Sequence, residues 1–123
     1  MREIKFRIWS IRDNVFVKDN RVAICANGYI IRWDYDLEEL EYIHDHNNFI
    51  KSQYTGLKDK NGKEIFEGDI LKFEDGEGFY LEQVIYKGGA FYAVNLQDEN
   101  LLYEVNDIDF IVGNKFENPE LLK

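Results

Sequence analysis

The chain has 123 residues and a formal net charge of −9, an acidity that disfavours nonspecific binding to phosphate backbones without excluding a local basic patch. Hydrophobic residues make up 45% and aromatic residues 15% of the sequence, which excludes a disordered chain and is sufficient for a core. No apolar run approaches the ~20 residues of a membrane-spanning helix, and the charged start of the chain lacks a secretory signal pattern. Because Cys25 is the single cysteine, we expect a cytoplasmic protein without a disulfide or a cysteine-based metal site.

The first third of the chain reads as short strands. An alternation of apolar and charged residues from Ile4 to Ile8 predicts a half-buried strand. Turn residues follow at Arg12–Asn14, so Val15–Val17 is expected to pair back as the second arm of a hairpin. Two more strands are predicted, with a turn between them at residues 27–28, over Val22–Cys25 and Tyr29–Trp33.

The segment 34–46 has two possible interpretations. Leu37, Leu40 and Ile43 recur every three residues, and Asp36 and Glu39 have the spacing of a capping box. This pattern favours a short helix of about two turns. The alternative is a continued strand, in which Leu37, Glu39 and Glu41 would share one face with few apolar side chains.

From Phe49 onward, short apolar runs alternate with turns. The turn at Asn61-Gly62 suits a tight hairpin with positive φ at both central positions, and residues 87–89 predict a second tight hairpin. A single 3₁₀ turn is expected at residues 107–109, and Pro119 is expected to stop regular structure. The predicted strands are Phe49–Tyr54, Lys63–Phe66, Ile70–Phe73, Phe79–Tyr86, Ala90–Leu96, Leu101–Val105 and Phe110–Phe116. This many short strands suits a small closed barrel.

Three stretches of the sequence resemble the signature of one protein family. They are the start Met1–Arg7, the central stretch Gln53–Ile70 and the end Val112–Leu122. In these stretches the chain resembles the YopX family of phage and prophage proteins, for which no biochemical activity is established. The resemblance implies an SH3-like barrel in the second half of the chain.

The expected fold is therefore mainly β, with an N-terminal β-hairpin or small sheet, at most one short helix, and a C-terminal SH3-like barrel. We expect the hairpin and a variable linking segment in residues 1–48, and the barrel in residues 49–123.

One loop has features of a binding site. Tyr54, Lys58, Lys60 and Lys63 combine an aromatic residue with basic residues, a composition that nucleic-acid-binding loops use. Neighbouring acids reduce the local charge, and a lysine-rich hairpin is commonly a solvated turn. These four residues are the candidate binding residues.

Five residues of the central signature are expected to have structural roles. The glycines are expected at turns where a side chain would obstruct the backbone, and Asp69 at the start of a strand as a side-chain cap. The set is Gly56, Asn61, Gly62, Gly68 and Asp69.

Other reactive residues point to no site. His44 and His46 could hold zinc if they lie on a strand, but a solvated loop is the preferred interpretation. Asp107 and Asp109, or Glu67 and Asp69, could form a hydrolytic carboxylate pair, although capping roles are favoured. No metal site, catalytic residue or cofactor is assigned.

The sequence thus predicts a non-enzymatic protein-interaction module, and the family resemblance implies an accessory phage or prophage protein in the cytoplasm of a bacterial host. The expected partner is another protein or a second copy of the chain, without a membrane. Nucleic-acid binding through the Tyr54–Lys63 hairpin is the first alternative, and a small hydrolase is the second.

Overall fold

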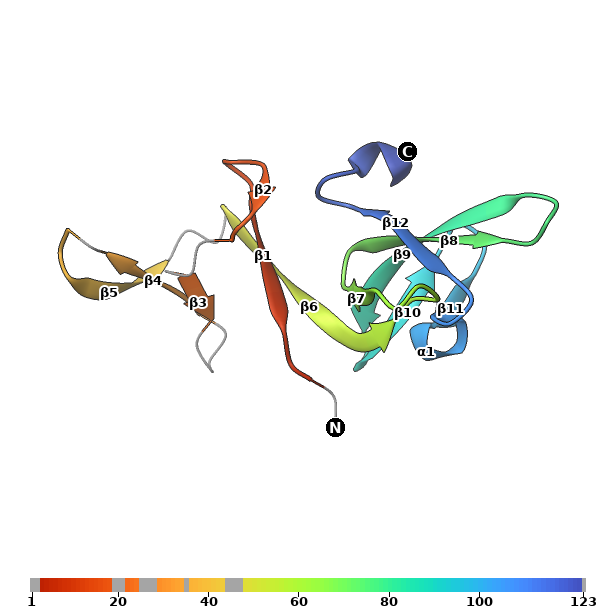
Figure 1. Cartoon of the computed structure of the whole chain (residues 1–123), viewed down its shortest axis with the longest axis horizontal. Coiled ribbons are helices and arrows are strands. Elements are labelled where there is room, and N and C mark those ends of the chain that lie inside the picture. Colours follow the sequence, from red (N-terminus) through yellow and green to blue (C-terminus); the bar gives the residue numbers. More distant parts are fainter. Residues whose placement is uncertain (1–2, 19–21, 25–28, 35, 44–47, 123) are drawn as a thin grey trace. The chain divides into compact units, whose positions relative to one another are not determined.

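The computed structural model describes residues 3–18, 22–24, 29–34, 36–43 and 48–122 (Figure 1). The chain divides into two units, and each is described by itself. The larger unit comprises Met1–Arg7 and Ser52–Lys123, and the smaller unit comprises Ile8–Lys51. The chain passes from the smaller to the larger unit between Lys51 and Ser52, close to the boundary predicted after residue 48. The first seven residues, which were predicted to belong with the N-terminal part, group with the larger unit.

The smaller unit contains a hairpin and a three-stranded antiparallel sheet. In the hairpin, Trp9 pairs with Phe16, and their rings meet edge to face at 4.9 Å between centroids. The sheet has the order β3-β4-β5. The strands of this part are β1 (Phe6–Ser10), β2 (Val15–Phe16), β3 (Val22–Ile24), β4 (Ile30–Asp34) and β5 (Glu39–Ile43). The predicted hairpin and strands are confirmed, and the predicted turn at Asn27-Gly28 lies outside the described residues.

The helix predicted within residues 34–46 is wrong, and the strand interpretation is right. Residues 36–38 form a turn in which Glu38 has a φ of 52°, and this left-handed conformation interrupts a helix. The chain then returns as β5, with Leu40 opposite Trp33 in the register. Pairing with β4 satisfies the backbone hydrogen bonds of this segment, so the three-residue apolar spacing does not decide its conformation.

The larger unit is built around a curled antiparallel sheet of order β11-β10-β9-β8-β12 (Figure 1). Its strands are β8 (Asp69–Glu74), β9 (Phe79–Lys87), β10 (Ala90–Val94), β11 (Glu99–Leu101) and β12 (Phe110–Asn114), and β6 (Phe49–Lys58) with β7 (Glu64–Phe66) forms a further hairpin. The mainly β class is confirmed. The SH3-like barrel agrees with this strand order and stays a prediction.

The β9–β10 hairpin confirms the predicted tight turn. Lys87 pairs with Ala90, which leaves Gly88 and Gly89 as a two-residue loop with φ values of 58° and 88°. Positive φ at both central positions defines a type I′ turn, whose twist matches that of the paired strands.

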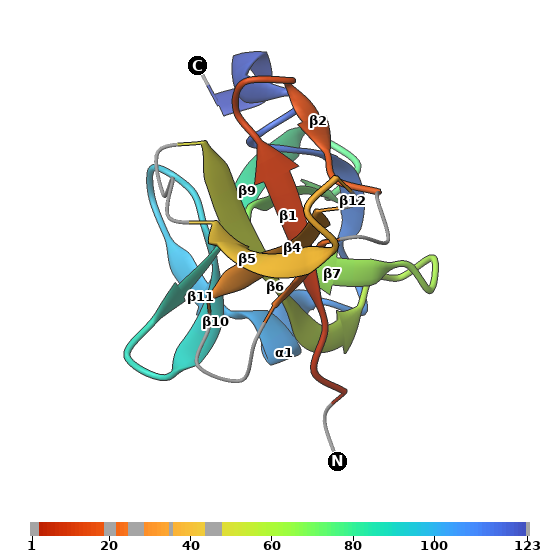
Figure 2. The same ribbon diagram turned by 90° about the vertical axis from the view of Figure 1, so that its left-hand side faces the viewer.

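The one α-helix in the described part of the chain is α1 (Leu102–Val105), where a strand was predicted. Residues three apart lie on one face of a helix. Leu102 is therefore fully buried while Val105 packs against the same core, and Tyr103 and Glu104 face solvent. Figure 2 shows α1 beside β10 and β11.

Two further predictions near the C-terminal end need correction. The turn expected at residues 107–109 lies at residues 106–108 and continues directly from α1, where the Val105 carbonyl accepts bonds from the N–H groups of Ile108 and Asp109, both at 3.1 Å. Pro119 begins the 3₁₀ helix η1 (Pro119–Leu122) instead of ending regular structure. Proline suits the first turn of a helix because no hydrogen bond to its nitrogen is needed there.

The core of the larger unit gathers residues from β7 through α1. Its buried members are Ile65, Leu71, Val84, Phe91, Ala93 and Leu102, and the half-buried Leu57, Val105 and Ile111 pack against them. Alternate residues of β9 and β10 are buried, as the period-two pattern of the sequence predicted.

The Asn61-Gly62 turn forms a hairpin, but its type differs from the prediction. Gly62 has a φ of 83°, whereas Asn61 is not in the positive-φ region. The Gly62 N–H donates to the Asp59 carbonyl at 3.0 Å, and the Asp59 N–H donates to the Lys63 carbonyl at 2.8 Å. These bonds define a three-residue loop, a type I turn followed by one left-handed residue.

Substituting Gly62 with valine should lower the free energy of unfolding by about 1–2 kcal/mol, because a β-branched residue is strained at positive φ. No atom lies within 4 Å of an added Cβ, so the loss should come from the backbone alone. Urea denaturation of the variant measures it. Unchanged stability would refute the turn assignment.

Candidate functional site: an acidic pocket

The larger unit contains a pocket of about 290 Å³. Its lining comes from β8, β9, the β10–β11 turn, β11 and the end of α1. The lining residues are Phe73, Tyr80, Glu82, Asn95, Gln97, Asp98, Asn100, Val105, Ile108 and Asp109. One water occupies ~30 Å³ in the liquid, so the pocket has room for a side chain rather than for one small ion.

Two buried acids meet in this pocket. Glu82 is 5% exposed on β9, and Asp109 is 1% exposed just before β12. No donor among the described residues bonds either carboxyl oxygen of Asp109, and both oxygens are shielded from solvent. Its neighbour is the Glu82 carboxyl, and a proton shared between the two acids gives each a hydrogen bond.

The environment of Asp109 favours this shared proton. Burial, and after it the hydrogen bond and the charge of Glu82, raise the pKa of Asp109 to about 8. Asp107 adds to this shift, and Lys60 opposes it. At neutral pH Asp109 therefore retains its proton, which its carboxyl can donate to a Glu82 oxygen.

An aromatic pair forms one wall of the pocket. The rings of Phe73 and Tyr80 are stacked, with 6.2 Å between centroids and an interplanar angle of 13°. Tyr80 is 47% exposed, so part of its surface is accessible to a ligand. Val105 and Ile108 add apolar surface from α1 and the turn after it.

The rim of the pocket is held in place by Asn95. Its side-chain oxygen accepts hydrogen bonds from the N–H groups of Gln97 and Asp98, both at 2.8 Å. The Asn95 N–H also donates to the Asp98 carbonyl at 2.9 Å. The turn that carries Asp98 is therefore fixed by three bonds, and a third carboxyl lies at the pocket.

The charge of the lining is of one sign. The described residues that line the pocket include three acids and no basic side chain. Carboxyls in such a partly apolar site attract a cation strongly, because little water screens them. The arrangement can bind a positively charged group of side-chain size.

Replacing Asp109 with asparagine should raise the free energy of unfolding by about 2–4 kcal/mol at pH 9 and change it little at pH 4. The contribution of the Asp109 proton to stability is fully present below the ordinary carboxyl pKa and declines as pH rises to about 8, above which Asp109 is ionised. The asparagine amide donates to Glu82 at every pH. Urea denaturation from pH 4 to 9 checks the prediction, and Glu77→Gln, in the exposed β8–β9 loop, is the control. Parallel curves for wild type and Asp109→Asn would contradict it.

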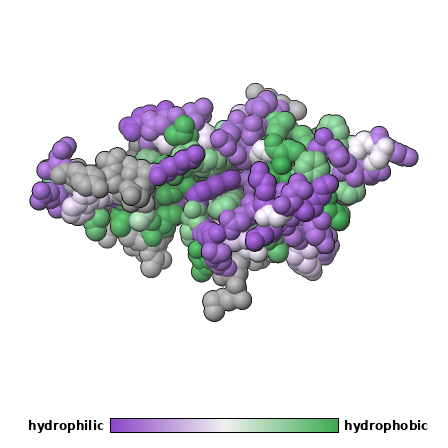
Figure 3. Space-filling view, in the orientation of Figure 1, coloured by the Kyte–Doolittle hydropathy of each residue, from purple (hydrophilic) through white to green (hydrophobic). Residues whose placement is uncertain are grey.

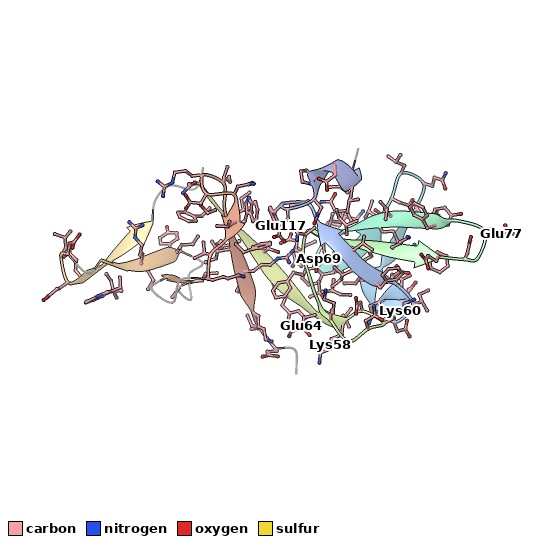
Figure 4. The ribbon with its side chains drawn as sticks, turned by 45° about the horizontal axis from the view of Figure 1, so that its top comes forward. Lys58, Lys60, Glu64, Asp69, Glu77 and Glu117 are labelled. Carbon is pink, nitrogen blue, oxygen red and sulfur yellow. The ribbon has the colours of Figure 1, made fainter. Side chains whose placement is uncertain are left out.

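The residues predicted to bind do not line the pocket, although the Lys60 N–H donates to the Asp109 carbonyl at 3.0 Å. Tyr54 is buried at 4% exposure, and its ring packs against Phe66 and beneath the Lys5 ammonium. Lys58, Lys60 and Lys63 are exposed, and the Lys60 ammonium lies 4.6 Å from the centre of the Phe110 ring. Figure 4 shows Lys58 and Lys60 far from Glu77, which marks the tip of the β8–β9 loop. The structure therefore does not bring an accessible aromatic ring of Tyr54 to these lysines.

The structural residues of the signature agree with the expectation in part, because Asn61 is outside the positive-φ region and Gly56 lies within β6 rather than at a turn. Gly56, Gly62 and Gly68 have positive φ. Asp69 is buried, and its carboxylate accepts bonds from the Phe66 N–H and from Arg7, both at 2.7 Å. Asp69 thus caps the turn before β8 rather than forming a catalytic pair.

Sequence reasoning missed Glu82, and it considered Asp109 only with Asp107, as a hydrolytic carboxylate pair that was not favoured. A signal existed at Glu82, because it shares the buried alternation of β9 with Val84, and an acid at such a position requires a partner. His44 and His46 lie outside the described residues, within which no group of three metal-binding side chains occurs. None of the helices in the described part is long and apolar enough to span a membrane.

The fold and site together define a small, mainly β protein with an acidic pocket beside a curled sheet. The model of the YopX protein family matches residues 5–123, and the chain belongs to this family.

Two solved structures are similar over the full length of both chains. Protein EF1440 from Enterococcus faecalis has a TM-score of 0.70 and 27% sequence identity, and each chain is covered to 100%. Protein yopX from Bacillus subtilis has a TM-score of 0.65 and 21% identity, again with 100% coverage of each, and it supports the fold alone. Among curated proteins, none matches this chain.

Proposed function

We propose that the protein is a non-enzymatic interaction module that binds a basic segment of another protein through its acidic pocket. The observation that carries this proposal is the buried Glu82–Asp109 pair in a lining without a basic side chain. A net charge of −9 adds long-range attraction for a basic partner. Figure 3 shows polar residues over much of the visible surface, as expected for electrostatic rather than broad apolar contact.

The wider setting of the proposal comes from the family resemblance. From this resemblance we infer an accessory role in a phage or prophage, in the cytoplasm of a bacterial host. Self-association is a second form of the same proposal, in which a basic loop of one copy occupies the pocket of another. Lys58, Lys60 and Lys63 provide exposed positive charge for that contact.

Hydrolysis has less support than binding. A general base must reach the proton that it removes. The Asp109 oxygens are shielded from solvent, and the pair shares its proton directly, so an attacking water has no access to Asp109.

The test is fluorescence anisotropy of the intact chain with labelled peptides and nucleic acids at low salt. We expect micromolar binding of a capped basic nonapeptide, no binding of an acidic peptide of equal length, and none of DNA or RNA below ~100 μM. Sedimentation measures self-association in parallel. Salt-sensitive binding of nucleic acid that is lost on replacing Lys58, Lys60 and Lys63, without peptide binding, would replace the proposal by its alternative.

A further inference from the structure

We infer that the acidic pocket, in the binding role proposed above, takes an arginine side chain of the partner protein, and that its entry expels the proton shared by Glu82 and Asp109. Glu82 would pair with the guanidinium, and the proton would pass to the solvent. Three features of the pocket support this ligand class, and each is independent of the overall charge of the chain.

The first feature is the buried carboxyl pair itself. Asp109 has no donor among the described residues, and Glu82 faces it from β9. A guanidinium presents five N–H donors and no acceptor, so it can pair with the Glu82 carboxylate, while the shielded Asp109 acts through its proton. Charge-assisted bonds of this kind are about twice as strong as neutral ones.

The second feature is the size of the pocket and the apolar and aromatic character of its lining. The volume of about 290 Å³ suits a long side chain, and Val105 and Ile108 offer apolar surface to its methylene groups. The stacked Phe73 and Tyr80 rings offer aromatic surface beside the acids. A planar guanidinium stacks on such a ring more favourably than the compact lysine ammonium does.

The third feature is the set of charges around the pair. Glu82 faces Asp109 from β9, Asp98 belongs to the rim, and Asp107 adds negative charge from the turn after α1. Lys60, from the β6–β7 turn, is the opposing charge at Asp109. An incoming cation adds to the effect of Lys60, so it favours the doubly ionised pair and drives the proton out.

Proton release makes binding dependent on pH. Because the pair has one proton to lose below about pH 8, affinity for arginine should rise with pH by up to about tenfold per unit, and level off above that pH. A pocket that bound arginine through surface charge alone would show no such rise in this range.

The experiment titrates the intact chain with capped Gly-Gly-X-Gly-Gly peptides, where X is arginine, lysine or citrulline. Amide chemical shifts of the pocket residues report the site. We expect a Kd on the order of 1–10 mM for arginine at pH 7, at least about threefold weaker binding for lysine, and none for the neutral citrulline. Calorimetry in phosphate and in Tris at pH 6.5 should show release of about one proton.

Three variants separate the roles of the two acids. Glu82→Gln should weaken arginine binding about tenfold or more, because it removes the carboxylate that meets the ligand. Asp109→Asn should retain binding at pH 7 but abolish both the pH dependence and the proton release, since its amide bonds Glu82 without a shared proton. Glu77→Gln removes one exposed charge from the β8–β9 loop and is the control. It should leave arginine binding, its pH dependence and the proton release unchanged.

The possible failures are distinguishable. If basic nonapeptides bind but the arginine peptide does not perturb the pocket, this inference is wrong and the proposed function stands. Equal binding of citrulline, or tighter binding of Ca²⁺ alone at the pocket, would also overturn it. If neither peptide class binds, the proposed function fails as well.

Discussion

Replacement of Arg7 with alanine should lower the free energy of unfolding by about 3–5 kcal/mol, the largest single effect that we expect. The Arg7 guanidinium donates to Asp69 at 2.7 Å, to the Ser52 hydroxyl at 3.2 Å and to the Glu67 carbonyl at 3.3 Å. It also lies 4.9 Å from the centre of the Phe66 ring. Its removal leaves the Asp69 carboxylate, 3% exposed, without its charged partner.

The loss should depend on pH in a way that identifies Asp69 as its source. Burial raises the pKa of Asp69 above its ordinary value, although Arg7 and the Phe66 N–H lower it. Without Arg7 the pKa rises further, so the variant is least impaired near pH 4, where the buried acid holds its proton, and most impaired near pH 8.

Urea denaturation followed by circular dichroism at both pH values measures these effects. Arg12→Ala is the control, because Arg12 is exposed and its ion pair with Asp13 spans 3.6 Å at the surface. It should change stability by less than about 0.5 kcal/mol. The loss in free energy of unfolding for Arg7→Lys should fall between those of Arg7→Ala and Arg12→Ala, since an ammonium restores the charge but not the forked geometry. Equal losses for Arg7→Ala and Arg12→Ala would refute a structural role for this contact.

Substitution of Gly68 by valine should cost about 2–4 kcal/mol, for two reasons that act together. Gly68 has a φ of 90°, a conformation that β-branched residues rarely adopt. An added Cβ would also lie 3.1 Å from the Phe116 ring and 3.3 Å from the Lys115 side chain. The backbone has little freedom to move, because the Gly68 N–H donates to Val84 and its carbonyl accepts from Lys115, both at 2.8 Å.

Gly76→Val separates the two contributions. Gly76 has a φ of 88°, nearly that of Gly68, but no atom lies within 4 Å of an added Cβ. Its cost should be about 1–2 kcal/mol, from backbone strain alone. Thermal unfolding of both variants provides the comparison, and a Gly68→Val loss no larger than that of Gly76→Val would mean that the close packing at Gly68 contributes nothing.

The strand pattern was predictable wherever alternate residues face a core or a turn residue fixes the connection. The β9–β10 hairpin is the clearest example, because Gly88-Gly89 suits one turn type and sets the register of both strands. Segment 34–46 was not predictable in the same way. Its three-residue apolar spacing favoured a helix, and pairing of β5 with β4 decided for a strand.

In segment 101–105 the error was reversed, since a strand was predicted and a helix is present. Local propensity there favoured a strand, but a turn of helix allows Leu102 and Val105 to reach one core while the residues between them face solvent. At Asn61-Gly62, the sequence predicted a hairpin, and the hydrogen bonds of Asp59 with Gly62 and Lys63 decided its type.

The sequence by itself determined the mainly β class, the YopX membership and the turn positions of the signature, because each depends on residues that are close along the chain. Only the tertiary structure decided the pocket. Glu82 lies within β9 and Asp109 lies just before β12, and neither is unusual among its neighbours in the sequence. Their shared burial arises when β9 and the turn before β12 come together, and the physical consequence, one proton between two acids, is a property of that proximity alone.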